Sequence, residues 1–216
     1  MGEKIKELNP LGYKPVGKLL KSLAIPAIIA NLVNALYNVV DQIFIGQGIG
    51  YLGNAATNIA FPITTMCLAI GLTLGIGGAS NFNLELGKGY PEKSKHTAGT
   101  AASTLIIIGI ILCITVRIFL EPLMIGFGAT DKILEYSMKY TGITSYGIPF
   151  LLFSIGVNPL VRADGNAKYS MVAIVIGAIL NTILDPLFMF VYNLGIAGAA
   201  WATVISQIVS ATLLLI

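Results

Sequence analysis

Charged residues are scarce in this chain of 216 residues. Asp, Glu, Lys and Arg together make up 11% of it, whereas a soluble domain carries about 25%. Hydrophobic residues make up 56%. A soluble monomer of this composition would expose more apolar surface than water tolerates. The shortage of charge therefore excludes an ordinary soluble domain and predicts an integral membrane protein.

Cysteine and dense basic tracts are also lacking. The two cysteines, Cys67 and Cys113, lie in apolar runs and form neither a zinc motif nor a disulfide framework. No stretch has the dense basic face that nucleic acid requires, so we expect no nucleic-acid partner. A cleavable signal is absent too, because the apolar run after residues 1–21 is longer than the roughly 7–15 residues of a signal sequence.

The chain contains six apolar segments, each close to the roughly 20 residues that a helix needs to cross a bilayer. We therefore expect an all-α membrane protein, a bundle of six transmembrane helices surrounded by lipid. A partly amphipathic segment at 119–135 is expected to form a short interfacial turn. The expected cytoplasmic tail is 1–21, and residues 22–216 form the bundle, with approximate helices at 22–46, 56–80, 98–120, 136–159, 169–192 and 195–216.

The basic residues predict an orientation. Ten of the thirteen lie in the N-terminal tail and in the connections between helices two and three and between helices four and five, where Arg162 falls in a turn-rich stretch at 162–166. Basic residues collect on the cytoplasmic side of membrane proteins. We therefore expect a multi-pass protein of the cell (inner) membrane with a cytoplasmic N-terminus.

Two acidic residues, Asp41 and Asp185, lie inside expected helices. A carboxylate at the centre of a spanning helix costs at least ~2.5 kcal/mol, and such residues usually face a protein interior and serve a function. At 1.5 Å per residue, Asp41 lies roughly 30 Å from Lys21, and Asp185 roughly 25 Å from Lys168. Thr203 lies roughly 12 Å into the last helix from its outer end. All three side chains fall in the outer half of the membrane and could share one site.

Polar residues repeat at spacings of three and four, which places them on one face of a helix. They are Asn34, Tyr37, Asn38 and Asp41 on helix one, Asn181 and Asp185 on helix five, and Thr203 and Gln207 on helix six. Carboxylate, amide and hydroxyl oxygens are the ligands of a hard cation such as Na⁺, and a carboxylate in an apolar bundle can also take up and release a proton. A purely structural role is the alternative for Asn34, Asn38 and Gln207, because interhelical hydrogen bonds contribute ~0.6 kcal/mol each. Otherwise these three residues line a substrate cavity.

Pro26 lies early in helix one and removes one backbone hydrogen bond there. Two interpretations remain open. Pro26 forms a static kink, or it forms a hinge whose bend responds to the charge state of Asp41 on the same helix.

Six short motifs carry a family resemblance. They are AIPAI at 24–28, LYNVVDQIFIG at 36–46, AFP at 60–62, GIPF at 147–150, LNTILD at 180–185 and GIAGAAWAT at 195–203. In this order and spacing the chain resembles the MATE (multidrug and toxic compound extrusion) transporters over nearly its whole length.

The resemblance implies secondary antiport, in which amphipathic and often cationic organic compounds are exported in exchange for H⁺ or Na⁺. It implies no cofactor besides that coupling ion. The hinge of helix one corresponds to Pro26. The implied cation-coupling residues, which would also be the ligands of Na⁺, are Asp41, Asn181, Asp185 and Thr203, with Tyr37 beside them.

The family has about twelve helices in two related lobes, and the substrate path runs between them. This chain therefore resembles the N-terminal lobe of a two-lobed transporter. The C-terminal lobe is expected as a partner, supplied by the same full-length chain or by a second chain. We favour a fragment, because the sequence stops within apolar residues.

Two other functions are alternatives. A flippase for lipid-linked saccharides, from the same superfamily, would need a more cationic cavity for phosphate, and no basic residue lies deep in the expected helices. An intramembrane aspartyl protease would use Asp41 and Asp185 as general acid and base. It would need the two carboxyl groups in contact and a flanking Gly-x-Gly-Asp motif, which neither residue has.

Overall fold

The computed structural model describes residues 15–215, and six helical spans among them are long and apolar enough to cross a membrane. The fold class predicted from the sequence is confirmed. Residues 1–14 of the expected cytoplasmic tail lie outside the described residues. The elements are α1 (Val16–Ile49), α2 (Tyr51–Gly87), α3 (Pro91–Ile118), α4 (Leu120–Gly126), α5 (Asp131–Thr144), η2 (Ser145–Gly147), α6 (Ile148–Ala163), α7 (Ala167–Pro186), η3 (Leu187–Val191) and α8 (Ile196–Leu215).

Most helices extend beyond the apolar segments. The expected helices therefore begin several residues too late at 22, 56 and 98 and end several residues too early at 46 and 80. A helix does not end where hydropathy falls, because its backbone hydrogen bonds continue until a stop signal. Gly50, with φ 82°, separates α1 from α2, and Gly89, with φ 84°, precedes α3. Pro91 then starts α3, where its missing N–H costs nothing. The expected turn at 119–135 contains the short helix α4.

The fourth and fifth spans are irregular. The fourth, Asp131–Ala163, consists of α5 and α6 joined by the 3₁₀ turn η2. The fifth, Ala167–Val191, changes from α-helix to the π-helix η3 directly after Pro186. Proline cannot donate a backbone hydrogen bond, which disturbs the α-helical ladder at this point. Short π-helical segments often occur at functional sites, and this one begins two residues after Asp185.

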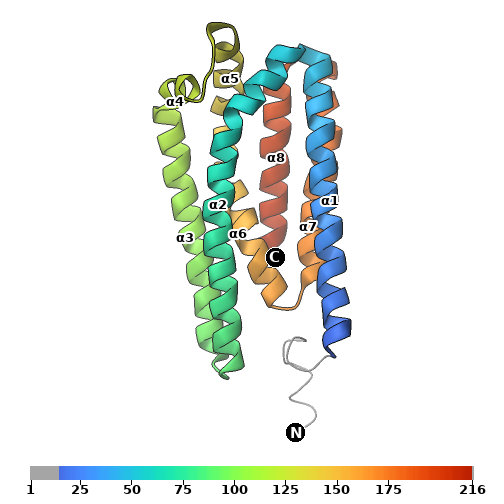
Figure 1. Cartoon of the computed structure of the whole chain (residues 1–216), viewed down its shortest axis with the longest axis vertical. Helices are drawn as coiled ribbons and strands as arrows, with labels where there is room; N and C mark the ends of the chain where they lie inside the picture. Colours follow the sequence, from blue (N-terminus) through green and yellow to red (C-terminus); the bar gives the residue numbers. More distant parts are fainter. Residues whose placement is uncertain (1–14, 216) are drawn as a thin grey trace.

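The helices form two groups that share α8 (Figure 1). α2, α3 and α6 pack against one another, and α1 packs mainly against α7. α8 packs against α7 and also against α5 and α6. α1 and α2 meet at the Gly50 turn and diverge toward the opposite end of the bundle, as Figure 1 shows. A cavity lies between α1, α2, α6, α7 and α8.

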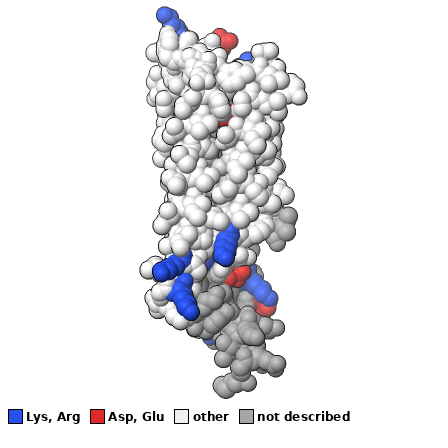
Figure 2. Space-filling model, turned by 90° about the vertical axis from the view of Figure 1, so that its right-hand side faces the viewer, with Lys and Arg blue, Asp and Glu red and all other residues white. Residues whose placement is uncertain are grey.

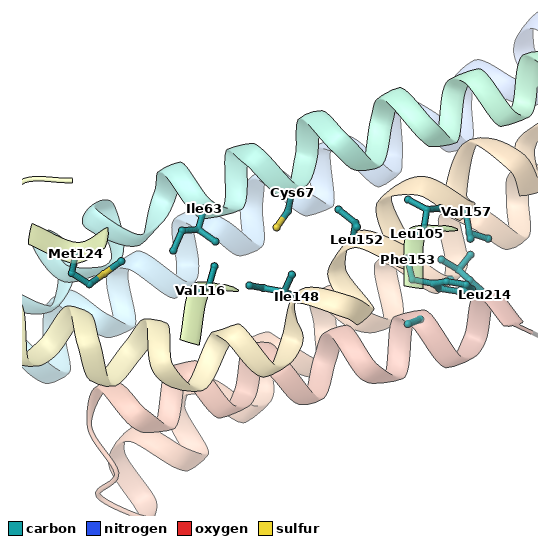
Figure 3. Close-up of a cluster of buried hydrophobic side chains, with 12 residues drawn as sticks. Ile63, Cys67, Leu105, Val116, Met124, Ile148, Leu152, Phe153, Val157 and Leu214 are labelled. Atoms are coloured by element: carbon teal, nitrogen blue, oxygen red, sulfur yellow. The ribbon is translucent and has the colours of Figure 1, made fainter. Parts of the chain in front are cut away.

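The apolar core lies in the group of α2, α3 and α6. Ile63 and Cys67 of α2 face Ile148 and Leu152 of α6 (Figure 3). The helices approach closely because glycines face each other. A Cβ atom on Gly75 of α2 would lie 2.7 Å from the Cα atom of Gly156 in α6. Larger side chains at these positions would force the two helices apart.

Charged side chains gather at the two ends of the bundle, and a broad belt between them is almost free of charge (Figure 2). Large apolar side chains are exposed along this belt. On α1, Ile28, Leu32 and Val39 are each more than half exposed. Such a surface suits contact with lipid or with further membrane helices.

Candidate functional site

Asp41 of α1 and Asp185 of α7 meet in the interior of the bundle. Their exposures are 7% and 0%, and their carboxyl groups lie within hydrogen-bonding reach of each other. Among the described residues, neither carboxyl group has a Lys, Arg or His within the 4.0 Å of an ion pair. Two buried carboxylates in contact cannot both stay ionised without a counter-charge. The pair therefore requires a proton or a bound cation.

Asn181, Thr203 and Tyr140 surround the pair on the side of α7 and α8. The Asn181 side-chain amide donates to Oδ1 of Asp185 over 3.3 Å, one helical turn away on α7. The same amide nitrogen lies 3.5 Å from Oγ1 of Thr203 on α8. The hydroxyl group of Tyr140 on α5 lies within hydrogen-bonding reach of Thr203. Four helices thus contribute polar groups to one cluster.

Gln42 and Thr57 flank the pair on the side of α2. The amide of Gln42 donates to Oδ2 of Asp41 over 3.3 Å. The Thr57 hydroxyl lies 3.1 Å from Oε1 of Gln42 and 2.9 Å from the carbonyl oxygen of Asn54. The amide of Gln42 is therefore held by α2 while it contacts the acid of α1.

Three buried oxygens in this cluster have no hydrogen-bond partner among the described residues: Asp41 Oδ1, Asp185 Oδ2 and Asn181 Oδ1. Buried polar atoms normally have partners, and each exception calls for an explanation. Carboxylate and amide oxygens fit a proton or a hard cation such as Na⁺. Among the described residues, no three or more His, Cys, Asp or Glu side chains come together where they could hold a metal ion.

Two cavities, each lined by both polar and apolar side chains, adjoin the cluster. The first, of about 390 Å³, lies between α1, α2, α6, α7 and α8, and the second, of about 180 Å³, lies between α1, α2, α5, α6 and α8. Tyr37, Thr203 and Gln207 line both cavities. Asn34 lines the first and Asn38 the second, where its amide also donates to the Asn34 carbonyl over 2.7 Å. The structure thus places the sequence-predicted residues Asn34, Tyr37, Asn38, Thr203 and Gln207 along cavities that adjoin the polar residues around the acidic pair.

The structure also places Pro26. It is buried inside α1, and the helix continues through it from Val16 to Ile49. The side chain lies one turn before Ala30, which lines the first cavity. Its role as a hinge stays a prediction.

Sequence reasoning missed Tyr140, Gln42 and Thr57. The polar run on α5 around Tyr140 is a sequence signal that could have identified it, because Ser137, Thr141 and Thr144 recur there at helical spacing. Gln42 is adjacent to Asp41 in sequence, but its contact with Thr57 depends on the turn between α1 and α2.

The expected position of Arg162 in a turn is wrong. Arg162 lies in the last turn of α6, and its side chain lines the first cavity. Arginine is favoured in the last turn of a helix, where it complements the partial negative charge of the terminus. α6 ends at Ala163, four residues beyond the expected boundary at 159.

Comparison with known proteins agrees with this architecture. A sequence profile of the MatE family matches residues 26–187. The multidrug export protein MepA of Staphylococcus aureus (strain NCTC 8325 / PS 47) is 25% identical over 213 residues, covering 99% of this chain and 47% of MepA. A FAD transporter of Shewanella oneidensis is 29% identical, covering 97% of this chain and 47% of its own.

A solved structure agrees as well. An outward-facing multidrug resistance MATE family transporter of the MOP superfamily superposes with a TM-score of 0.83 at 30% identity, covering 91% of this chain and 44% of that one. The chain thus spans about half the length of the relatives it matches. Because the family profile covers most of the chain, this multi-pass membrane protein belongs to the MatE (MATE) family of transporters.

Proposed function

We propose that this chain forms the cation-coupling half of a secondary antiporter, which exports amphipathic and often cationic organic compounds in exchange for H⁺ or Na⁺. The observation that carries the proposal is the buried contact between Asp41 and Asp185 near a cavity that polar and apolar side chains line together. The names of MepA and of the solved multidrug transporter support the export of drugs. The protein would lie in the cell membrane with its N-terminus in the cytoplasm.

Coupling would follow from electrostatics. With a proton or Na⁺ bound, the net charge of the pair is reduced and α1 can stay packed on α7. After release, two carboxylates in contact repel each other strongly in a low-dielectric interior. That repulsion would move α1 relative to α7, and Pro26 is the position on α1 where a backbone hydrogen bond is already absent. The adjoining cavity would change shape with α1, because Asn34 and Tyr37 line it.

Alternating access needs a second bundle, because such transporters move one bundle against the other. We propose that the remainder of the full-length protein, or a second chain, supplies the C-terminal lobe. Small organic substrates would then bind between the two lobes and in the cavities of this one. A lipid-linked saccharide flippase and an intramembrane protease are less favoured. The carboxyl groups do meet as a protease would require, but the family consists of transporters.

Reconstituted vesicles test the proposal. The full-length protein should accumulate the fluorescent cation rhodamine 123 when an H⁺ or Na⁺ gradient is imposed, and Asp41→Asn should abolish this accumulation without loss of the folded protein. Asp164→Asn removes an exposed carboxylate and should leave accumulation unchanged. Undiminished accumulation in Asp41→Asn would refute the coupling role.

The same vesicles identify the coupling ion. Accumulation under a pH gradient in the absence of Na⁺ indicates H⁺, and accumulation under a Na⁺ gradient at equal pH indicates Na⁺. If neither gradient drives accumulation by the wild-type protein, antiport of this dye is excluded.

A further inference from the structure

Arg162 is a charged group that the coupling mechanism does not use. It lies at the end of the first cavity where α6 ends and α7 begins. No other charged side chain among the described residues lines that cavity. The remaining lining is apolar or neutral and polar, so a single guanidinium group sets the charge of this end.

The guanidinium group is oriented but only partly bonded. Its Nε donates to Oγ of Ser170 on α7 over 3.1 Å, and Ser170 in turn donates to Oδ1 of Asn158 over 2.6 Å. Ser170 and Asn158 are buried, with exposures of 0% and 6%. The terminal nitrogens Nη1 and Nη2 have no acceptor among the described residues, and no carboxylate there lies within the 4.0 Å of an ion pair.

Arg117, in the same bundle, has partners for its guanidinium group. Its Nη1 donates to the carbonyl of Gly142 over 2.9 Å, and its guanidinium carbon lies 4.1 Å from the centre of the Tyr146 ring. Among the residues that the structure describes, Arg162 has neither a carbonyl nor an aromatic ring as a partner. Its planar pair of terminal N–H groups therefore remains available to bind an oxyanion in bidentate geometry.

Further polar side chains line the first cavity beside Arg162. Ser154, Asn158 and Arg162 follow each other at intervals of four residues on α6, so they form one stripe roughly 12 Å long. All three line the cavity. The Ser154 hydroxyl and the Ser206 hydroxyl of α8 are buried and have no hydrogen-bond partner among the described residues, and Ser206 is only 6% exposed. The cavity wall therefore offers hydroxyl groups between the arginine and the middle of the bundle.

The acidic pair is too far away to neutralise this charge. Ser170, which holds the guanidinium group, and Asp185 are fifteen residues apart on α7, which corresponds to roughly 22 Å along the helix. The cavity region thus has a cationic group at one end and the carboxyl pair beyond the other. A substrate with a negative group at one end and an apolar or cationic body would match this polarity.

We propose that Arg162 is a specificity-determining residue that binds a carboxylate or phosphate group of amphipathic substrates at this end of the cavity. The inference rests on the proposed function and deepens it, because it extends the substrate class from cationic compounds to zwitterionic and anionic ones. The name of one relative, the FAD transporter, is in keeping with an anionic substrate.

Two dyes with the same ring system test this site. Rhodamine 110 carries a free carboxylate, and rhodamine 123 is its methyl ester. Binding of each to the purified full-length protein can be measured by fluorescence anisotropy. Hydrogen bonds to charged groups are strong enough that Arg162→Gln should weaken rhodamine 110 binding by ~10-fold or more. The same change should alter rhodamine 123 binding by less than ~2-fold, because the ester offers no charge to the arginine.

Two further variants control for charge and folding. Lys168→Gln removes a nearby exposed positive charge and should leave both affinities unchanged. Arg162→Lys keeps the charge but loses the fork of N–H groups, and it should weaken rhodamine 110 binding alone by a smaller factor. If Arg162→Gln does not fold, the affinities of Arg162→Lys for the two dyes test the anion site in its place.

The outcomes separate this inference from the antiport proposal. Equal losses for both dyes, or no loss for either, would overturn the anion site even if rhodamine 123 still accumulates under an ion gradient. A selective loss of rhodamine 110 binding, in a protein whose wild type shows no gradient-driven accumulation, would support the anion site and exclude antiport of rhodamine 123.

Discussion

At the scale of single residues, Tyr140 is one of the three members of the site that sequence reasoning missed. Its hydroxyl lies within hydrogen-bonding reach of Thr203, next to the Asp41 and Asp185 pair. A neutral hydrogen bond contributes about 0.5–1.5 kcal/mol, so losing it should weaken cation binding by roughly 2- to 10-fold. Tyr140→Phe should therefore raise the H⁺ or Na⁺ concentration needed for half-maximal transport, measured from initial rates in vesicles.

Tyr136 supplies the matched control for this change. It lies one turn earlier on α5 and lines a different hollow, near Asn193 and Gly195 between helix ends. Tyr136→Phe should leave the half-maximal ion concentration unchanged. An unaltered value in Tyr140→Phe as well would exclude the Tyr140 hydroxyl from the cation site.

The residues that could be predicted from the sequence are those whose chemistry conflicts with their surroundings. Asp41 and Asp185 stood out because a carboxylate is costly within an apolar helix. Asn181 and Thr203 followed from spacing and depth. The mutual contact of the two acids could not be predicted, because it depends on how α1 and α7 are rotated and on the change to π-helix after Pro186. Arg162 was misplaced because a turn signal at 164–166 was taken to begin too early.

At the scale of helices, the contact between α2 and α6 depends on glycine. A Cβ atom on Gly75 would lie 2.7 Å from Cα and 2.9 Å from the carbonyl carbon of Gly156, both backbone atoms that cannot rotate away. Gly75→Ala should therefore destabilise the protein by about 1–3 kcal/mol, the usual cost of overpacking. Thermal unfolding of the detergent-solubilised protein measures the effect.

Gly77 lies two residues further along the same helix, and a Cβ atom there would meet nothing within 4 Å. Gly77→Ala should change stability by no more than about 1 kcal/mol, because alanine only favours the helix. Equal unfolding temperatures for the two variants would contradict the close approach of α2 and α6.

The number of membrane helices was easier to predict than their ends. Apolar length counts only the part of a helix in the hydrocarbon, whereas α2 continues through Glu85 to Gly87. The polar residues after the apolar segment still satisfy their backbone groups within the helix. The break at Ser145–Gly147 was also missed, although Gly147 and Pro149 mark it in the sequence and the residues before it are partly polar.

At the scale of the whole molecule, charge is distributed unequally between the two ends of the bundle (Figure 2). The described basic residues Lys18, Lys88 and Lys93 lie at the end where α1 begins and α2 ends, and Lys132 and Lys139 lie at the opposite end. The proposed anion site at Arg162 belongs to the first end and the carboxyl pair is nearer the second. If basic residues mark the cytoplasmic side, substrates would meet the arginine from the cytoplasm and the coupling ion would enter from outside.

Cysteine labelling decides this orientation. Lys93 and Lys132 are both exposed and lie at opposite ends of the bundle. In a full-length protein without its native cysteines, Lys132→Cys should react with a membrane-impermeant maleimide on intact cells. Lys93→Cys should react only after the cells are permeabilised. The opposite pattern would invert the protein in the membrane, and Arg162 would then face substrates from outside, which is the wrong side for recognising compounds that are to be exported.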